Sequence, residues 1–203
     1  MKVLQCNSDA VCAETIQAAV AVLRGGGIVA NPTDTCYGLA ADPFNEKGLK
    51  KLYAIKGMPE DKPVSILVRS LEEAKKYGYF SDMAIRMAVD FWPGSLTLVV
   101  PRTDLLPDYF NSDSDTVGIR VINEPVTLAL LEAFDGPLTT TSANKHGKPC
   151  AYTFDEITAT ADLVIDVGEL TYRQKPSTII QIDGERATMI RQGDLLLDLH
   201  GPS

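Results

Sequence analysis

Histidine is scarce in this chain, and the cysteines form no recognisable motif. Two histidines, His146 and His200, occur among 203 residues. A hydrolase triad with a histidine base is therefore not expected, and no G-x-S-x-G sequence is present. The four cysteines, at positions 6, 12, 36 and 150, include no C-x-x-C pair. We therefore expect reduced thiols and no zinc site.

Long apolar segments are missing as well. No stretch approaches the ~18 uninterrupted apolar residues that a transmembrane helix needs. The first residues carry no apolar run of the kind found in signal peptides. These absences predict a cytoplasmic protein with no membrane partner.

The sequence has no typical phosphate-binding glycine loop. The pattern G-x-x-x-x-G-K-[ST] does not occur, because Gly147 and Lys148 are followed by Pro149. Three consecutive glycines at 25–27 follow a predicted helix and precede a predicted strand, which reverses the order in a nucleotide-binding loop. We interpret these glycines as a helix stop.

Positive charge is in deficit, since the formal net charge is −8. A broad electrostatic surface for nucleic acid is therefore not expected, although a local basic pocket is compatible with this charge. Apolar residues make up 45% of the chain, which is enough for a normal core. We predict one domain over residues 1–197 and a tail at 198–203.

Helical and strand patterns alternate along the chain, which predicts an α/β fold: a single domain with a twisted mixed β-sheet flanked by helices. Capping residues predict helices that begin after Ser8-Asp9, Asn45, Ser70, Ser81 and Glu124, with weak helical character at 154–160. Strands are predicted at 28–30, 36–40, 64–68, 96–100, 116–121, 138–144 and 163–165, and a hairpin at 177–191. Residues 102–115 are predicted to form a mobile surface loop.

Hydrogen-bond donors are concentrated at 139–149, where four hydroxyl residues, an amide and two lysines follow an apolar strand. Six cations lie on loops or at the ends of elements: Lys56, Lys62, Arg120, Lys148, Arg173 and Arg191. Open α/β folds place ligands at such positions. Reactions at phosphorus need positive charge and positioning more than acid–base groups, which suits this set. The alternative is a polar turn and solvated surface charges.

Six segments, in their order along the chain, resemble the YrdC-like family of threonylcarbamoyl-adenylate synthases. They are PTDTCYGL at 32–39, KGMP with KP at 56–63, GIRV at 118–121, TSAN with GKP at 141–149, STI at 177–179 and RQG at 191–193. The similarity extends from about residue 10 to residue 193. It implies a YrdC-like fold with a concave, positively lined ligand cleft.

The resemblance also implies a reaction. L-Threonine, bicarbonate (or CO2) and ATP would give L-threonylcarbamoyl-adenylate and pyrophosphate, with Mg2+ held by the phosphates. Partner proteins would then transfer the threonylcarbamoyl group to the adenosine beside the anticodon of certain tRNAs.

Roles carried over from the family fall on eleven residues. Lys56 and Arg120 would be catalytic. Threonine would be bound by Thr35, Arg120, Ser142 and Ser177, with Arg120 holding its carboxylate. ATP would be bound by Lys56, Met58, Lys62, Thr116, Asn144, Tyr152 and Arg191. Each residue also has a plain structural interpretation, such as a strand-start hydroxyl for Thr35 or a turn cap for Ser177.

Met58 departs from the family pattern, which has Lys-x-Arg where this chain has Lys56-Gly57-Met58. A thioether cannot bind a phosphate as a guanidinium does. Lys145, Lys148 or Arg173 could replace the missing cation in space. Two other functions stay open at this point: a paralogue that binds tRNA or double-stranded RNA without catalysis, and an adenylate-forming enzyme for a different amino acid.

Overall fold

A computed structural model describes residues 1–145, 147–172 and 174–197. Its helices are α1 (Ala13–Arg24), α2 (Glu46–Lys56), α3 (Leu71–Tyr77), α4 (Asp82–Phe91) and α5 (Pro125–Phe134), with a short 3-10 turn η1 (Phe154–Glu156). Its strands are β1 (Lys2–Gln5), β2 (Val29–Asn31), β3 (Gly38–Ala40), β4 (Ser65–Val68), β5 (Leu96–Pro101), β6 (Thr116–Val121), β7 (Leu138–Ser142), β8 (Leu163–Asp166), β9 (Thr178–Asp183) and β10 (Arg186–Arg191). None of the described helices is long and apolar enough to cross a bilayer.

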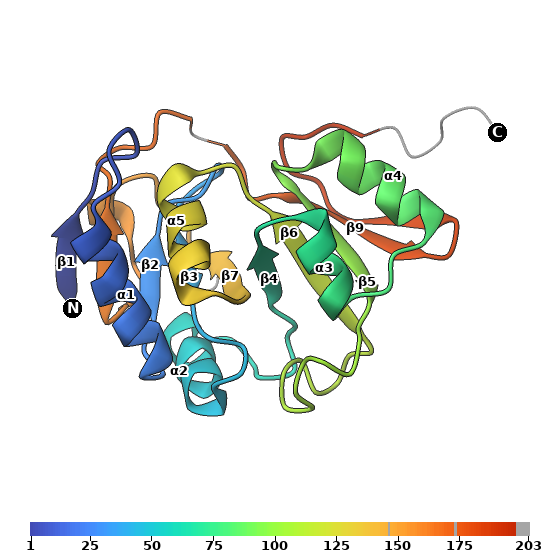
Figure 1. Ribbon diagram of the computed structural model, residues 1–203, viewed down its shortest axis with the longest axis horizontal. Coiled ribbons are helices and arrows are strands. Elements are labelled where there is room, and N and C mark those ends of the chain that lie inside the picture. Colours follow the sequence, from blue (N-terminus) through green and yellow to red (C-terminus); the bar gives the residue numbers. More distant parts are fainter. Residues whose placement is uncertain (146, 173, 198–203) are drawn as a thin grey trace.

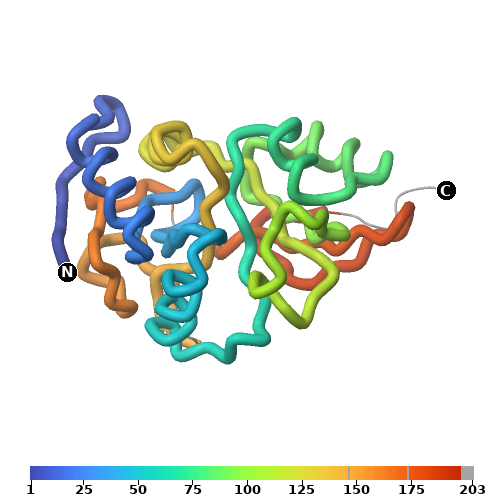
Figure 2. The backbone as a smooth tube through the Cα atoms, turned by 60° about the horizontal axis from the view of Figure 1, so that its bottom comes forward, coloured from blue at the N-terminus to red at the C-terminus, as the bar shows by residue number. Residues whose placement is uncertain are grey.

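The described strands form one ten-stranded mixed sheet in the order β1-β8-β2-β3-β7-β4-β6-β5-β9-β10. Parallel pairs bring together segments far apart in sequence, such as β1 with β8 and β5 with β9. Figure 2 shows this as blue chain beside orange at one end, and green beside red at the other. The predicted mixed α/β fold is therefore confirmed, because both parallel and antiparallel pairs occur within one sheet.

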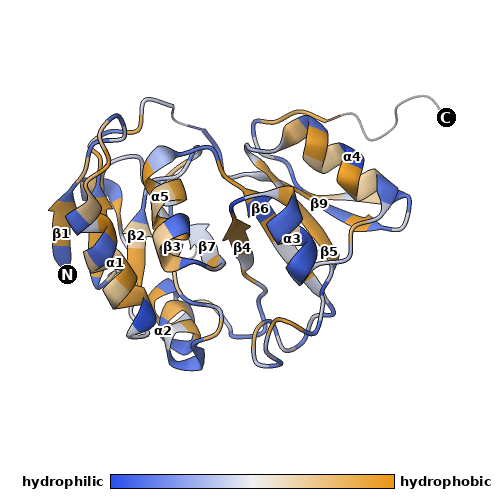
Figure 3. Ribbon diagram, in the orientation of Figure 1, coloured by the Kyte–Doolittle hydropathy of each residue, from blue (hydrophilic) through white to orange (hydrophobic). Residues whose placement is uncertain are grey.

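Helices α1 and α5 pack together on β2, β3 and β8 (Figure 1), through apolar residues that include Val29, Ala40 and Leu163, whereas α3 and α4 cover the other face of the sheet at β4, β5 and β6. Each helix is striped in Figure 3, with apolar residues on one side and polar residues on the other. The apolar sides pack on the sheet in two clusters. The larger of the two clusters joins β4, β5 and β6 to α3 and α4 through residues such as Ile119, Leu98 and Ala88. Helices α3 and α4 cover one face of β4, β5 and β6 and leave the other face, which carries Ser65, Gly118 and Arg120, open to a ligand.

Most predicted helix starts are confirmed by the hydrogen bonds at their first turns. The side chains of Asn45, Ser70, Ser81 and Glu124 each accept a backbone N–H bond three residues later, as an N-cap does. Gly57 ends α2 with φ = 61°, a left-handed conformation that glycine adopts without strain. The hairpin of β9 and β10 is also present.

Two elements differ from the expectations. Helix α1 begins at Ala13 rather than after Ser8-Asp9, because Ser8 instead donates a hydrogen bond to Glu124 at 3.2 Å. Strand β1 was not predicted, since most of it is exposed and it lacks an apolar run. Residues 102–115 form the predicted surface loop, in which Leu106 and Phe110 are buried and the Arg102 guanidinium donates to their carbonyl oxygens. The tail at 198–203 lies outside the described residues.

Candidate active site

A cleft of about 430 Å³ opens on the face of β5 and β6 that α3 and α4 leave uncovered. Side chains alternate between the two faces of a strand, and β6 shows the consequence. Thr116, Gly118 and Arg120 line the cleft, while Val117 and Ile119 face the apolar core. The volume lies in the range of pockets that hold cofactor-sized molecules.

Gly118 forms part of the floor of this cleft. A Cβ atom at this position would collide with the Ser65 hydroxyl and lie 3.1 Å from the Ser65 Cβ and 3.4 Å from Thr97. Strands β4 and β6 are neighbours and are paired in parallel, which fixes this close approach. Glycine therefore keeps the centre of the cleft open.

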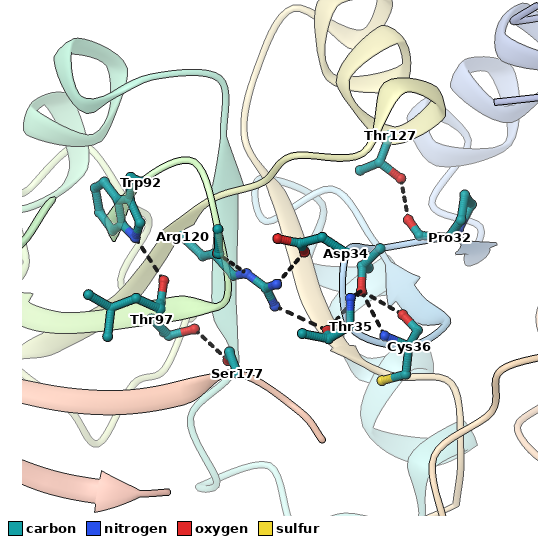
Figure 4. Close-up of polar contacts among 12 residues, drawn as sticks. Pro32, Asp34, Thr35, Cys36, Trp92, Thr97, Arg120, Thr127 and Ser177 are labelled. Carbon is teal, nitrogen blue, oxygen red and sulfur yellow. Dashed lines mark hydrogen bonds and ion pairs between the residues drawn. The ribbon is translucent and has the colours of Figure 1, made fainter. Parts of the chain in front are cut away.

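Arg120 is buried at the end of the cleft and is held by three neighbours (Figure 4). Its Nε–H donates to the carbonyl oxygen of Gly94 at 2.9 Å, one Nη–H to Thr35 Oγ1 at 3.4 Å, and another to the carboxylate of Asp34. Burial lowers the pKa of Arg120, and the Asp34 carboxylate opposes that effect. A guanidinium has five N–H donors, so two remain for a ligand carboxylate.

The turn that carries Asp34 and Thr35 is organised by the Thr33 hydroxyl. This hydroxyl donates to the Cys36 carbonyl oxygen at 2.6 Å and accepts the backbone N–H groups of Thr35 and Cys36 at 3.1 and 3.2 Å. The carbonyl oxygen of Pro32 also accepts a hydrogen bond of 2.6 Å from Thr127, in the first turn of α5 (Figure 4). The turn is thus rigid before any ligand binds.

Lys56, the last residue of α2, binds the loop that follows β7. Its ammonium donates to the carbonyl oxygens of Ser142 and Asn144, both at 2.6 Å, and to Asn144 Oδ1 at 3.1 Å. The Ser142 hydroxyl donates to the same Asn144 oxygen. Burial lowers the pKa of Lys56 to about 8. The ammonium has three N–H donors for these three acceptors, so the protonated form fits the geometry.

A third group joins the C-terminal hairpin to the cleft. Arg191 donates to the Ser177 carbonyl oxygen at 2.8 Å and to its hydroxyl at 3.2 Å. The Ser177 hydroxyl is also 2.8 Å from that of Thr97 on β5 (Figure 4). Ser177 is therefore fixed from two sides.

The structure brings ten of the eleven predicted site residues together. The residues on the cleft wall are Thr35, Lys56, Met58, Lys62, Thr116, Arg120, Ser142, Asn144, Ser177 and Arg191. Tyr152 is the exception, since it is not among the lining residues and its hydroxyl donates to the Gln174 carbonyl oxygen at 3.0 Å. The structure therefore does not bring Tyr152 to this cleft, and its role in ATP binding stays a prediction.

The cations considered as substitutes for an arginine at position 58 do not line the cleft in the described part of the chain. Lys145 and Lys148 are exposed and stand outside the lining set. Arg173 lies outside the described residues. Lys62 and Arg191 are the cations that share the cleft with Met58, along with Lys56 and Arg120.

Asp34 and Thr97 had been given no role from the sequence, although each contacts a predicted site residue. Asp34 adjoins Thr35 in the PTDT segment and is the acidic residue of that turn, which was a usable signal. Thr97 is a polar residue between apolar neighbours on a predicted strand. Such a residue faces away from the core, here toward the cleft.

The groups that line the cleft suit a magnesium ion that is bound by a ligand rather than by the protein. Among the described residues, no group of three or more His, Cys, Asp or Glu side chains is placed to hold a metal. The described lining residues offer hydroxyls and amide oxygens but no carboxylate. Mg2+ usually keeps several waters and binds through substrate phosphates, so these residues fit that mode of binding.

Comparison with known proteins identifies the family. The model for Sua5/YciO/YrdC domains, described as "Telomere recombination", matches residues 21–193. The chain belongs to the Sua5/YciO/YrdC family. A relative from Methanocaldococcus jannaschii, named a putative threonylcarbamoyl-AMP synthase, is 42% identical over 175 residues, which are 84% of this chain and 82% of that protein.

Two solved structures of the family have the same fold as this Sua5/YciO/YrdC protein. Sua5 of Pyrococcus abyssi complexed with L-threonine has a TM-score of 0.85 and 29% identity, over 95% of this chain and 58% of that one. YciO of E. coli has a TM-score of 0.86 and 26% identity, over 96% of this chain and 97% of that one. This chain thus corresponds to somewhat more than half of the Pyrococcus protein and to nearly all of YciO.

Proposed function

We propose that this protein is a threonylcarbamoyl-adenylate synthase, which converts L-threonine, bicarbonate or CO2, and ATP into L-threonylcarbamoyl-adenylate and pyrophosphate. The observation that carries the proposal is the buried Arg120, which keeps two N–H donors at the end of a hydroxyl-lined cleft. The relatives named as synthases and the threonine complex of a family member support it. These names favour catalysis over RNA binding alone.

In this reaction the threonine amine takes up CO2 to form a carbamate. A carbamate oxygen then bonds to the α-phosphorus of ATP, and the bond from that phosphorus to the pyrophosphate oxygen breaks. The reaction requires no enzyme nucleophile, which fits a cleft that has no histidine among its described lining residues. Positioning and positive charge carry most of the catalysis in transfers at phosphorus.

The threonine subsite comprises Arg120 and the hydroxyls of Thr35, Ser142 and Ser177. Arg120 binds the α-carboxylate through its free N–H donors, because a planar guanidinium matches a carboxylate. Thr35 is held 3.0 Å from Thr33 and is therefore fixed in advance. Preorganised hydroxyls reduce the entropy lost on binding.

The nucleotide subsite comprises Lys62, Thr116, Asn144 and Arg191, with Met58 on its wall. Lys56 acts there mainly by holding Asn144 and Ser142, since its three N–H donors already have acceptors. Magnesium would be held by the triphosphate and would supply charge neutralisation. In the cytoplasm, partner proteins use the product to modify the adenosine beside a tRNA anticodon.

The test is pyrophosphate release from ATP, measured with and without L-threonine and bicarbonate. Release that requires both substrates is expected, and serine or valine in place of threonine should support it poorly. Arg120→Ala should abolish release. Arg186→Ala removes an exposed arginine outside the cleft and is the matched control. No release from the wild type under any combination would overturn the proposal.

A further inference from the structure

Two cysteines that lie far apart in the sequence meet beside the cleft. Cys36 is buried on the cleft wall, and Cys150 is half-buried in the chain that follows the β7 loop. The Tyr37 N–H donates to the carbonyl oxygen of Ala151 at 2.8 Å, and each cysteine immediately precedes one of these residues. This backbone bond brings the two cysteine side chains close enough to interact with each other. Both thiols are free.

Positive charge surrounds this pair. Lys56 and Arg191 act on Cys150, and Arg120 acts on Cys36. The interaction with Cys36, together with these cations, lowers the pKa of Cys150 to about 7, whereas the same interaction and burial raise the pKa of Cys36. A thiolate with such a pKa reacts readily with oxidants near neutral pH.

We propose that Cys36 and Cys150 form a reversible oxidation site in which a peroxide converts the two thiols into a disulfide that closes the cleft to threonine. The Cys150 thiolate attacks one peroxide oxygen, the O–O bond breaks, and the leaving oxygen departs as water after taking a proton. Cys36 then attacks the sulfur of the Cys150 sulfenic acid. The S–S bond forms, the S–O bond breaks, and a second water leaves. A dithiol reverses the change.

The disulfide affects the cleft because a covalent S–S bond is only about 2.05 Å long, much shorter than a contact between two separate thiols. One of the two segments must therefore move. On one side, the Thr33 hydrogen bonds join Cys36 to Thr35. On the other, the Lys148 carbonyl oxygen accepts a hydrogen bond from the Asn144 amide. A shift of about 1 Å in positioning groups reduces rates by about a hundredfold.

Peptide mapping tests the pairing directly. Trypsin leaves Cys36 in residues 25–47 and Cys150 in residues 146–173, whereas Cys6 and Cys12 share residues 3–24. After treatment of the whole protein with hydrogen peroxide, we expect peptides 25–47 and 146–173 joined, with the loss of two hydrogens. A link from either peptide to 3–24, or overoxidised Cys150 with no link, would overturn the proposal.

The effect on the cleft is measured as threonine binding by calorimetry, which does not depend on turnover. Interpreting a loss of threonine binding rests on the proposed function, whereas detecting the Cys36–Cys150 link does not. Failure of the proposed function and failure of the disulfide proposal can therefore be told apart. We expect oxidation to weaken threonine binding by the wild type and dithiothreitol to restore it. Cys150→Ser should bind threonine with the same affinity before and after treatment with hydrogen peroxide. Cys12→Ser, the control, should respond like the wild type. A full Cys36–Cys150 link with unchanged threonine binding would overturn closure of the cleft.

Discussion

The carboxylate of Asp34 is paired with the guanidinium of Arg120, and the two side chains are only 13% and 5% exposed. The pair joins the PTDT turn to β6 across 86 positions of sequence. Asp34 orients the guanidinium while leaving donors for a ligand. It also reduces the net positive charge that a threonine carboxylate would meet.

Variants of this pair should separate binding from stability. Arg120→Ala is expected to weaken threonine binding by about two orders of magnitude or more and to destabilise the fold by about 3–5 kcal/mol, because Asp34 is left buried without its partner. Asp34→Asn keeps an acceptor and removes the competing charge, so threonine should bind at least as well. Calorimetry and thermal unfolding measure the two effects.

The double variant Asp34→Asn/Arg120→Gln is the decisive control. It replaces the ion pair with a neutral, hydrogen-bonding pair and should recover most of the stability that Arg120→Ala loses. Threonine affinity should stay low, because the carboxylate has lost its cation. If the double variant bound threonine as the wild type does, Arg120 would be structural only.

The pH dependence of activity should reflect Lys56. Its pKa of about 8 means that the ammonium, with three N–H donors, predominates below that pH. Above it, the neutral amine can serve only two of the three acceptors on Ser142 and Asn144. We therefore expect kcat/KM for pyrophosphate release to fall as pH rises through about 8. Lys56→Arg should be less active but should lack this alkaline limb, and persistence of the limb would contradict the assignment.

The lowered pKa of Lys56 predicts that stability rises with pH, whereas activity falls. Since burial lowers the pKa of Lys56 from 10.5 to about 8, the unfolded chain binds more protons at this lysine between these values. The destabilising contribution of Lys56 is complete below pH 8 and declines as pH rises toward 10.5. Urea unfolding of the wild type and of Lys56→Met across this pH range isolates the contribution of Lys56 to the free energy of unfolding. A difference in that free energy that did not vary with pH would argue against the lowered pKa.

Local patterns were sufficient to predict most elements of the fold. Asn45 and Gly57 mark the ends of α2, and alternation predicted β6 to the residue. Strand β1 escaped prediction because an exposed edge strand carries no apolar signature. The strand order also could not be predicted, since the parallel pairing of β5 with β9 depends on contacts distant in sequence.

The site was predictable as a set of residues but not as a network. Motifs in order brought Thr35, Lys56 and Arg120 into one cleft. Which acceptors Lys56 would choose, and that Asp34 would hold Arg120, depend on three-dimensional packing. Tyr152 is the predicted residue that does not line the cleft, because the irregular chain after Pro149 gives no periodic pattern from which to fix its direction.

Met58 should limit the rate of the reaction. Its side chain lines the cleft, in the part where we propose that the nucleotide binds, and offers no charge to phosphate. Met58→Arg adds a cation there, and arginines that meet transferring phosphates contribute large rate factors. We expect kcat/KM for ATP to rise at least about tenfold in the pyrophosphate assay. Met58→Gln matches the size without the charge and should leave the rate near that of the wild type. An equal rise in both variants would show that charge is not the cause.

Gly118 offers a test of the cleft floor. Gly118→Ala places a methyl group against the Ser65 hydroxyl, so strands β4 and β6 must separate or the serine must turn into the cleft. Either response should lower threonine or ATP affinity, and overpacking of this kind typically destabilises a protein by about 1–3 kcal/mol. Ser65→Gly alone removes the obstructing group.

The double variant Gly118→Ala/Ser65→Gly tests whether this contact explains the loss. If the clash is local, the double variant should recover most of the affinity and stability, giving a coupling energy of about 1–3 kcal/mol in a double-mutant cycle. The remaining contact with Thr97 at 3.4 Å is an ordinary one and should be tolerated. Additive effects in the cycle would instead mean that the alanine acts through the backbone, and the floor would then depend on glycine itself rather than on the space beside Ser65.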